Sequence, residues 1–394
     1  MKKTNSLSLA AIALAAIAAA CGGPASTSVD PGAADQKFLT ATPTFDHASV
    51  QIDDSDANPS SLEAGNTLQQ DVTADDCHPH LFSRTHEIAA RLNRHTWKLL
   101  RHVRDIIADH PKFKDGSTHT WESVKDGLDR KFTISLSADG STYTFELDLG
   151  QAAAAGSTTP AALVKVYGGT LSASTVAGVV TTNVSMTFDY DALHSVIATE
   201  KARGQLAITA KIVKDPSKPA PSLQKTMTIA FTNFLPEEGD AHGPRTGSFT
   251  HLGEPGIGGS MTFADSLILF CPANPTAKVA DTQTVARWFK KSTGGIAGRA
   301  DAKASGGQIP TGDNYLGVSC HNGTPGQGTT REVESAYWMM KLEDAAGNTV
   351  SGSSHEAING GTSPCDAALG QVPSLTNNAT DFNFAAAVSF PGQW

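Results

Sequence analysis

The chain has 394 residues, of which 39% are hydrophobic and 18% are charged, and its formal net charge at pH 7 is -9. It is long enough for one large domain or two modest domains with a packed core. The acidic balance excludes the strongly basic surface that a nucleic-acid-binding protein needs, so no nucleic acid is expected as a partner.

Residues 1–20 have the layout of a secretory signal peptide. Lys2 and Lys3 form a positive start, an apolar run extends from Leu7, and small residues precede the expected cleavage after Ala20. This run is too short and wrongly placed for a membrane span of the mature chain, and no later stretch approaches the roughly 20 apolar residues that a span needs. We therefore expect an exported protein.

Cys21 directly follows Ala18, Ala19 and Ala20. This arrangement resembles the lipobox of bacterial lipoproteins, although Ala18 stands where that family prefers Leu. The resemblance implies that Cys21 is diacylated, becomes the new N-terminus and anchors the chain to a membrane. By the same resemblance, Gly22 implies onward transfer to the outer membrane. The alternative is an ordinary signal-peptidase site that a cysteine follows by coincidence.

Residues 21–76 are rich in Ala, Ser, Thr, Asp, Gly and Pro and show no sustained hydrophobic period. Between Cys21 and His78, ten acidic residues accompany a single basic residue, Lys37, so the remainder of the mature chain is nearly neutral. Such a composition buries too little apolar surface to offset the entropy of ordering. We predict a disordered acidic tether, followed by a β-rich globular domain at residues 77–394.

The segment from about His78 to His110 has the strongest helical periodicity of the chain. Its apolar residues fall on one stripe: Leu81, Ile88, Ala89, Leu92, Leu99, Leu100, Val103, Ile106 and Ile107. Pro79 is tolerated in a first turn, and Pro111 ends the pattern. We expect one amphipathic helix of about 30 residues, roughly 45 Å long, packed through this stripe on a sheet.

The opposite flank of the helix carries a row of basic residues: Arg91, Arg94, Lys98 and Arg101. A solvated surface explains such a row, and the alternative is a face for an anionic partner such as lipid head groups or the acidic tether. His95 and His102 lie between the two faces, where an imidazole could titrate near neutral pH. His86-Glu87 lacks the second His of the HExxH zinc pattern because Ala90 stands there. No metal, cofactor or catalytic residue is predicted.

Beyond Asp126 the apolar residues recur at every second position. Lys131–Leu149 alternates on both sides of Asp139-Gly140, which is a strong hairpin signal. Further strands are expected at about 162–172, 181–190, 203–213, 224–234, 259–270, 284–290, 315–320, 333–343, 348–353 and 381–390. Since no helical pattern separates them, we predict a mainly β fold, with one large antiparallel sheet as a half-barrel or sandwich and the long helix packed on it. A change of composition near 240–258 allows either a subdomain break or one continuous, bent sheet.

Four further cysteines remain: Cys77, Cys271, Cys320 and Cys365. An even number in an exported chain favours two disulfides, and the sequence does not distinguish the three ways of pairing them. No CxxC pair is present, so a thiolate metal site is not expected.

Two functions from different classes fit these features. The first is an outer-membrane-anchored lipoprotein that acts without catalysis, as a binding or envelope-structural module, with an apolar or anionic lipid as its ligand class. The second is a periplasmic or surface hydrolase of envelope polymers, although no complete GxSxG motif is present. A pocket with a His and a carboxylate within hydrogen-bond reach would favour the hydrolase, whereas a dry apolar groove or no groove would favour the binding module.

Overall fold

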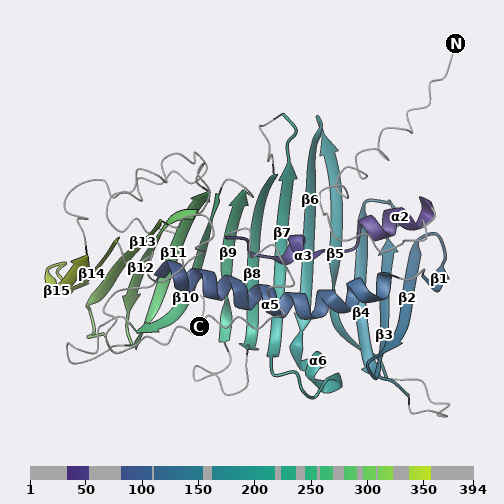
Figure 1. Ribbon diagram of the computed structural model, residues 1–394, viewed down its shortest axis with the longest axis horizontal. Coiled ribbons are helices and arrows are strands. Elements are labelled where there is room, and N and C mark those ends of the chain that lie inside the picture. Colours follow the sequence, from purple (N-terminus) through teal and green to yellow (C-terminus); the bar gives the residue numbers. More distant parts are fainter. Residues whose placement is uncertain are drawn as a thin grey trace.

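Alternating apolar residues form the strands of one open antiparallel sheet, in which each strand pairs with its neighbours in chain order (Figure 1). The computed structural model describes residues 33–52, 81–108, 111–153, 162–217, 223–236, 245–254, 258–268, 279–290, 296–307, 309–322 and 337–355. The fold class is confirmed as mainly β, with one large antiparallel sheet. The described strands form a single twisted sheet rather than two sheets of a sandwich.

Within the described residues, fifteen strands and four helices have the following bounds. The strands are β1 (Phe113–Lys114), β2 (Thr118–Lys125), β3 (Leu128–Leu136), β4 (Thr142–Gln151), β5 (Val164–Val176), β6 (Val179–Asp189), β7 (Arg203–Lys214), β8 (Leu223–Leu235), β9 (Arg245–Glu254), β10 (Gly258–Ile268), β11 (Val279–Lys290), β12 (Ile296–Ser305), β13 (Asn314–Asn322), β14 (Tyr337–Glu343) and β15 (Thr349–His355). The helices are α2 (Ala33–Thr40), α3 (Phe45–Ala48), α5 (Leu81–Ile107) and α6 (Tyr190–Val196).

The predicted hairpin is confirmed as β3 and β4, joined at Asp139-Gly140. Phe132 lies opposite Leu147 and Ile134 opposite Phe145, and all four side chains are fully buried. Gly140 has a φ of 72°, a left-handed conformation that glycine adopts without strain. The alternation of the two strands therefore places one row of apolar residues on one face of the sheet. We call this the inner face, because α5 covers it, and the opposite face the outer face.

Four strands were not expected, and each has a local reason. Strand β1 has only two residues, the sequence of β2 is polar, β9 lies inside the suspected break at 240–258, and β12 is rich in Ala and Gly. Strand β9 pairs with both β8 and β10, so the sheet is continuous there. The alanines of β12 are weak strand formers, but α5 contacts β11, β12 and β13, and small side chains let it approach closely. The strand expected at 381–390 lies outside the described residues.

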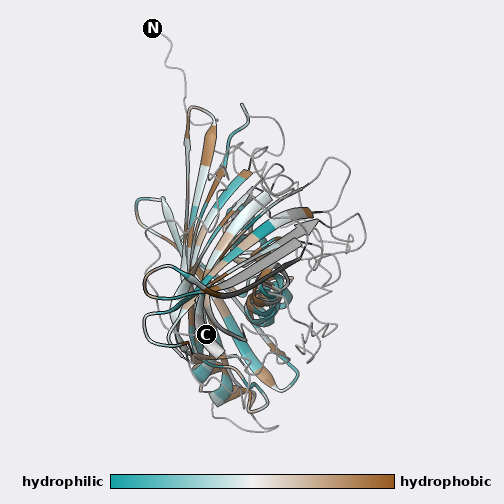
Figure 2. Cartoon of the chain, turned by 90° about the vertical axis from the view of Figure 1, so that its left-hand side faces the viewer, coloured by the Kyte–Doolittle hydropathy of each residue, from teal (hydrophilic) through white to brown (hydrophobic). Residues whose placement is uncertain are grey.

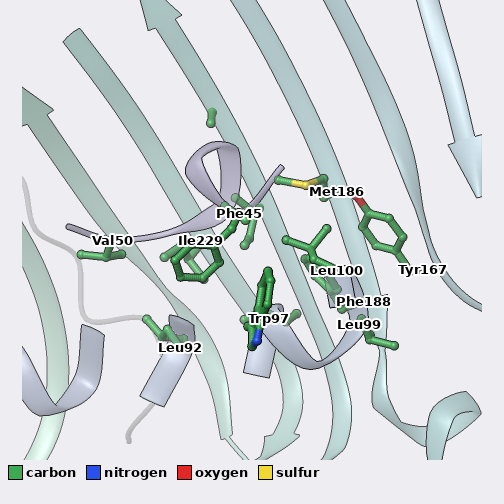
Figure 3. Close-up of a cluster of buried hydrophobic side chains, with 14 of the residues drawn as sticks. Phe45, Val50, Leu92, Trp97, Leu99, Leu100, Tyr167, Met186, Phe188 and Ile229 are labelled. Atoms are coloured by element: carbon green, nitrogen blue, oxygen red, sulfur yellow. The ribbon is translucent and has the colours of Figure 1, made fainter. Parts of the chain in front are cut away.

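Helix α5 crosses the inner face of the sheet, as the apolar stripe predicted (Figure 1). Every apolar residue of the stripe is buried except Ile107, which is half-buried against the same core. Figure 3 shows Leu92, Trp97, Leu99 and Leu100 beside sheet residues that include Phe188 and Ile229. The described helix spans Leu81–Ile107, and the outermost residues of the predicted range, 78–80 and 109–110, lie outside the description.

The prediction of a disordered tether is wrong for residues 33–52, which we call the strap. The strap lies on the same side of the sheet as α5 and contains α2 and α3 (Figure 1). Phe38 and Val50 are fully buried, and the Phe45 ring meets the Trp97 ring edge to face at 5.6 Å. The average composition of residues 21–76 did not reveal that this segment is ordered. Its few apolar residues dock on a surface that the helix and sheet already provide. The rest of the predicted tether lies outside the described residues.

Within the described residues, none of the helices combines the length and apolar character that a membrane span requires.

We expect Leu99→Ala to lower the free energy of unfolding by about 2 to 5 kcal/mol, because it removes a fully buried side chain and leaves a cavity. Arg101→Gln, on the exposed side of the same helix, should change it by less than about 0.5 kcal/mol. Urea denaturation of the two variants checks this. Equal losses would mean that α5 is not held through its apolar stripe.

Candidate functional site

The inner face of the sheet gathers most of the buried polar groups of the described chain, and the strap contacts several of them. Asn93 of α5 is fully buried, and its side-chain amide accepts a hydrogen bond from the Val50 N–H at 2.8 Å and donates one to the Val50 carbonyl at 2.7 Å. The Asn93 side chain thus makes the two backbone hydrogen bonds to Val50 that a neighbouring strand would make. Both backbone groups of Val50 are satisfied, so this contact fixes the C-terminal end of the strap.

Lys225 of β8 holds the strap at α3. Its side-chain ammonium donates to the carbonyls of Asp46 at 2.5 Å and Ser49 at 2.6 Å, and the residue is only 6% exposed. Burial lowers the pKa of Lys225 to about 7, and the charge of Asp46 partly opposes that shift. A lysine with such a pKa can serve as a nucleophile or base. Here its donors bind carbonyls at the end of α3, as a cation does at a helix C-terminus.

Two histidines lie near Lys225: His47, which is half-buried by exposure, and His251, which is buried. Burial, and secondly the charge of Lys225, lower the pKa of His47 to about 4 and that of His251 to about 3. The His47 Nδ1 accepts from the Thr44 N–H at 3.1 Å. The His251 ring lies 3.1 Å, through Nδ1, from the Ser260 carbonyl and stacks on Trp288 with ring centroids 5.8 Å apart. Both rings are therefore neutral at neutral pH and are held by the chain itself.

A histidine and a carboxylate meet at the other end of the strap. The Asp35 carboxylate of α2 lies 2.5 Å from the Lys114 Nζ and 3.5 Å from the His119 Nδ1. The Phe38 ring stacks on the His119 ring at 3.7 Å between centroids. Asp35 and His119 are 3% and 2% exposed, so a substrate would reach this pair only after the strap moved. Burial lowers the pKa of His119, and Asp35 opposes that shift.

The predicted basic flank is not uniformly exposed. Arg101 is exposed, whereas Arg91, Arg94 and Lys98 are half-buried. The Lys98 Nζ forms a bidentate contact with the Glu200 carboxylate at 3.1 and 3.2 Å, which ties the helix to the segment between α6 and β7. At least one member of the flank therefore has a structural role, and Arg101 is the one member in the exposed class.

His95 and His102, expected to titrate near neutral pH, both have lowered pKa values. Burial is the main cause, and it brings His95 to about 3 and His102 to about 4. The His95 ring meets the rings of Tyr190 and Phe234 edge to face at 5.8 and 5.5 Å. It is part of the core. Among the described residues, no group of three or more His, Cys, Asp or Glu could hold a metal ion.

Most of the cysteines for which lipidation or a disulfide is predicted lie outside the described residues. Cys21, Cys77, Cys271 and Cys365 are not among the described residues, and for Cys320 only the backbone is described, in β13 opposite Arg299. Lipidation and two disulfides therefore stay predictions.

The sequence reasoning missed a buried ion network on β11 and β12. Asp301 accepts from the Arg299 guanidinium at 2.6 to 3.0 Å, and Arg287 lies 3.8 Å from the same carboxylate. All three residues are buried. Arg299 and Asp301 share one face because they are two residues apart on a strand. Opposite charges at that spacing were the signal that could have found them.

Searches of protein-family models, curated proteins and solved structures found no match to this chain.

Stability should fall as the pH drops from 6.5 toward 4. His47, His95 and His251 have folded-state pKa values of about 4, 3 and 3, below the ordinary 6.5, so the unfolded state binds more protons in this window. Each histidine contributes a slope of up to about 1.4 kcal/mol per pH unit. The stability they contribute is fully present above pH 6.5 and is lost on acidification.

His95→Phe should reduce that slope, because phenylalanine fits among the Tyr190 and Phe234 rings and does not titrate. Urea denaturation at several pH values between 4.5 and 7 measures the effect. Leu99→Ala is the matched control, since it should lower stability by the same amount at each pH. An unchanged slope in His95→Phe would show that His95 is not a buried, neutral group.

Proposed function

We propose that this protein is an exported lipoprotein, anchored at a bacterial outer membrane through Cys21, that acts as a binding or envelope-structural module rather than as an enzyme. The observation that carries the proposal is that buried polar groups on the inner face are bonded to other groups of the same chain. There, Lys225 and Asn93 are bonded to the strap, and Asp35 of the strap is bonded to Lys114 of β1. These buried groups support folding, which leaves the exposed parts of the outer face and the edges of the sheet for partners.

The strap limits how far the domain can lie from its anchor. Its first residue, Ala33, comes twelve residues after Cys21, and an extended chain spans at most 3.3–3.6 Å per residue, so the reach is about 40 Å. Asp35 pairs with Lys114 of β1, and the Phe38 ring meets the Tyr143 ring of β4 at 5.8 Å. The anchor therefore holds the β1–β4 end of the sheet near the membrane, with β15 at the opposite end (Figure 1).

Side chains at the β1–β4 end suit a membrane surface. Phe113 is 54% exposed beside Lys112, which is also exposed, and Val124 of β2 is exposed as well. Lys114, on the other side of Phe113, is paired with Asp35. An aromatic ring beside a cation fits the interface of an anionic bilayer, where the ring enters the head-group region and the cation meets phosphates. Charged residues also protect an edge strand from pairing with other chains, so the position of Phe113 needs a direct test.

The alternative function, a hydrolase of envelope polymers, would rest on Asp35 and His119. This carboxylate and imidazole are 3.5 Å apart, but Phe38 covers the imidazole. Catalysis at this pair would require that α2 leave the sheet and break the Asp35–Lys114 ion pair. We favour the binding module because the described arrangement closes this site.

We expect Cys21→Ala to release the protein from the membrane fraction of the producing bacterium, because the acyl chains are the proposed anchor. Fractionation and intact mass measure the two consequences together. The wild-type protein should carry a diacylglycerol mass increment. A wild-type chain without that increment, together with a membrane-bound Cys21→Ala variant, would contradict the lipoprotein proposal.

The orientation has its own test with the acylated protein in anionic liposomes that contain a nitroxide-labelled lipid. Phe113→Trp should add tryptophan fluorescence that the label quenches, compared with the wild-type protein and its five tryptophans. Val350→Trp is the control, because Val350 is 59% exposed on β15 at the far end. Equal quenching in both variants would refute this orientation while leaving the anchor itself intact.

A further inference from the structure

The hairpin formed by β5 and β6 projects beyond its neighbour β4. Strand β4 begins at Thr142, which lies opposite Ser172 of β5. The last four residues of β5, 173–176, therefore extend past the end of β4 by about 13 Å, at 3.2–3.4 Å per residue. We call residues 173–180 the hairpin tip, and Figure 1 shows the two strands reaching the upper border of the sheet.

The hairpin tip is apolar, uncharged and largely exposed. Val176 is 73% exposed and Ala177 is exposed, whereas Val179 and Val180 are half-buried. Residues 166–188 contain no Asp, Glu, Lys, Arg or His, although 18% of the whole chain is charged. Figure 2, which is coloured by hydropathy, shows hydrophobic residues at the upper end of the hairpin. One exposed valine is ordinary on a protein surface, but the turn beside it is not.

The turn of this hairpin holds an alanine in a backbone conformation that favours other residues. Ala177 and Gly178 have φ angles of 50° and 83°, as in a type I′ turn, which prefers Asn, Asp or Gly at its first position. The β2–β3 turn has the same pattern, with Asp126 at 55° and Gly127 at 74°. Among the described residues, Ala177 is the only non-glycine with a positive φ that is neither Asp nor Asn. The tip thus carries an apolar residue where a polar one would be less strained, and such strain is typical of functional sites.

Two lysines of β7 lie behind the hairpin tip. Lys214 lies opposite Val180, and Lys211 lies three residues further from the turn. Lys211 is exposed and Lys214 is half-buried, and neither is paired with an acidic residue in the described part of the chain. Asp215 follows Lys214, and its carboxylate accepts hydrogen bonds from the N–H and the hydroxyl of Ser217 at 3.0 and 2.6 Å. The surface is therefore apolar at its end and basic behind it.

The strap enters the domain at the same end of the strands as the hairpin tip. The Phe38 ring of α2 lies 5.8 Å from the Tyr143 ring, and Tyr143 pairs with Leu171, five residues before Val176. Helix α2 begins twelve residues after Cys21, and an extended chain of that length reaches about 40 Å. The proposed anchor and the hairpin tip can therefore meet the same bilayer.

We propose that the hairpin tip enters the head-group region of the anionic bilayer to which the protein is anchored. The valines leave water there, and the lysines behind them meet lipid phosphates. Val176 and Val179 are paired with each other, so the closing pair of the hairpin brings its backbone groups to the interface with partners. The proposal rests on the proposed lipid anchor, since that is what brings the tip to a membrane surface.

A second copy of the chain is a less suitable partner for the hairpin tip. It would have to pair with the part of β5 that extends past β4, which has only four residues, whereas a typical strand has about five or six. The lysines behind the tip would also repel those of the other copy. An anionic bilayer needs no strand register and attracts the lysines.

Quenching of a tryptophan placed in the hairpin tip tests the proposal. The acylated protein is reconstituted in liposomes of phosphatidylcholine and phosphatidylglycerol that contain a nitroxide-labelled lipid. Compared with the wild-type protein, Val176→Trp should add fluorescence that the label quenches at least twice as strongly as it quenches the fluorescence added by Lys201→Trp. Lys201 is the matched control, because it is exposed and precedes β7 at the opposite end of the strands.

Ala177→Asp separates contact with the bilayer from folding. Aspartate occupies the equivalent position of the β2–β3 turn, so this substitution should not lower the urea midpoint of the protein. In the Val176→Trp background it should reduce the quenching at least twofold, because a carboxylate resists leaving water and is repelled by anionic lipid. Ala177→Asn should act in the same direction without the added charge. Ala346→Asp, which adds the same charge at an exposed turn before β15, should leave the quenching unchanged.

The proposal is overturned if Val176→Trp and Lys201→Trp are quenched equally, if both substitutions of Ala177 leave the quenching unchanged, or if Ala346→Asp reduces it as much as they do. A blue-shifted Val176→Trp emission without quenching would place the tip against protein, such as a second copy, and would overturn it as well. Flotation of the liposomes reads the anchor separately. Protein that floats but shows equal quenching contradicts only the tip contact, whereas acylated protein that does not float contradicts the anchor too.

Discussion

The burial of the α5 apolar stripe against the inner face of the sheet is the contact on which the rest of the structure depends. A large antiparallel sheet with one apolar face is not stable in water unless something covers that face. Leu99 and Val103 are almost fully buried there, and the alanines of β12 let the helix lie close to the sheet. Once α5 is in place, it and the sheet form the surface on which the strap docks through Phe38, Phe45 and Val50.

Polar contacts then make the position of the strap specific. Lys225, Asn93 and Asp35 are buried, and each is bonded to a group across the interface between the strap and the rest of the domain. Removing the strap from a dry inner face would leave these groups without partners, at a cost of roughly 1 to 3 kcal/mol for each neutral group and more for the charged ones. The strap is therefore part of the folded domain, which is why the proposed anchor controls the orientation of the whole sheet.

The sequence predicted the features that depend on local periodicity. The stripe of α5 and the β3–β4 hairpin follow from spacing within one segment, and both are confirmed. Strand β12 and the strap could not be found in this way, because their weak local preferences are decided by contacts with distant residues. Which residues share a face of the sheet depends on register, and a slip of one residue would move Thr209 to the other face. Thr209 and Thr228 become neighbours only through the pairing of β7 with β8.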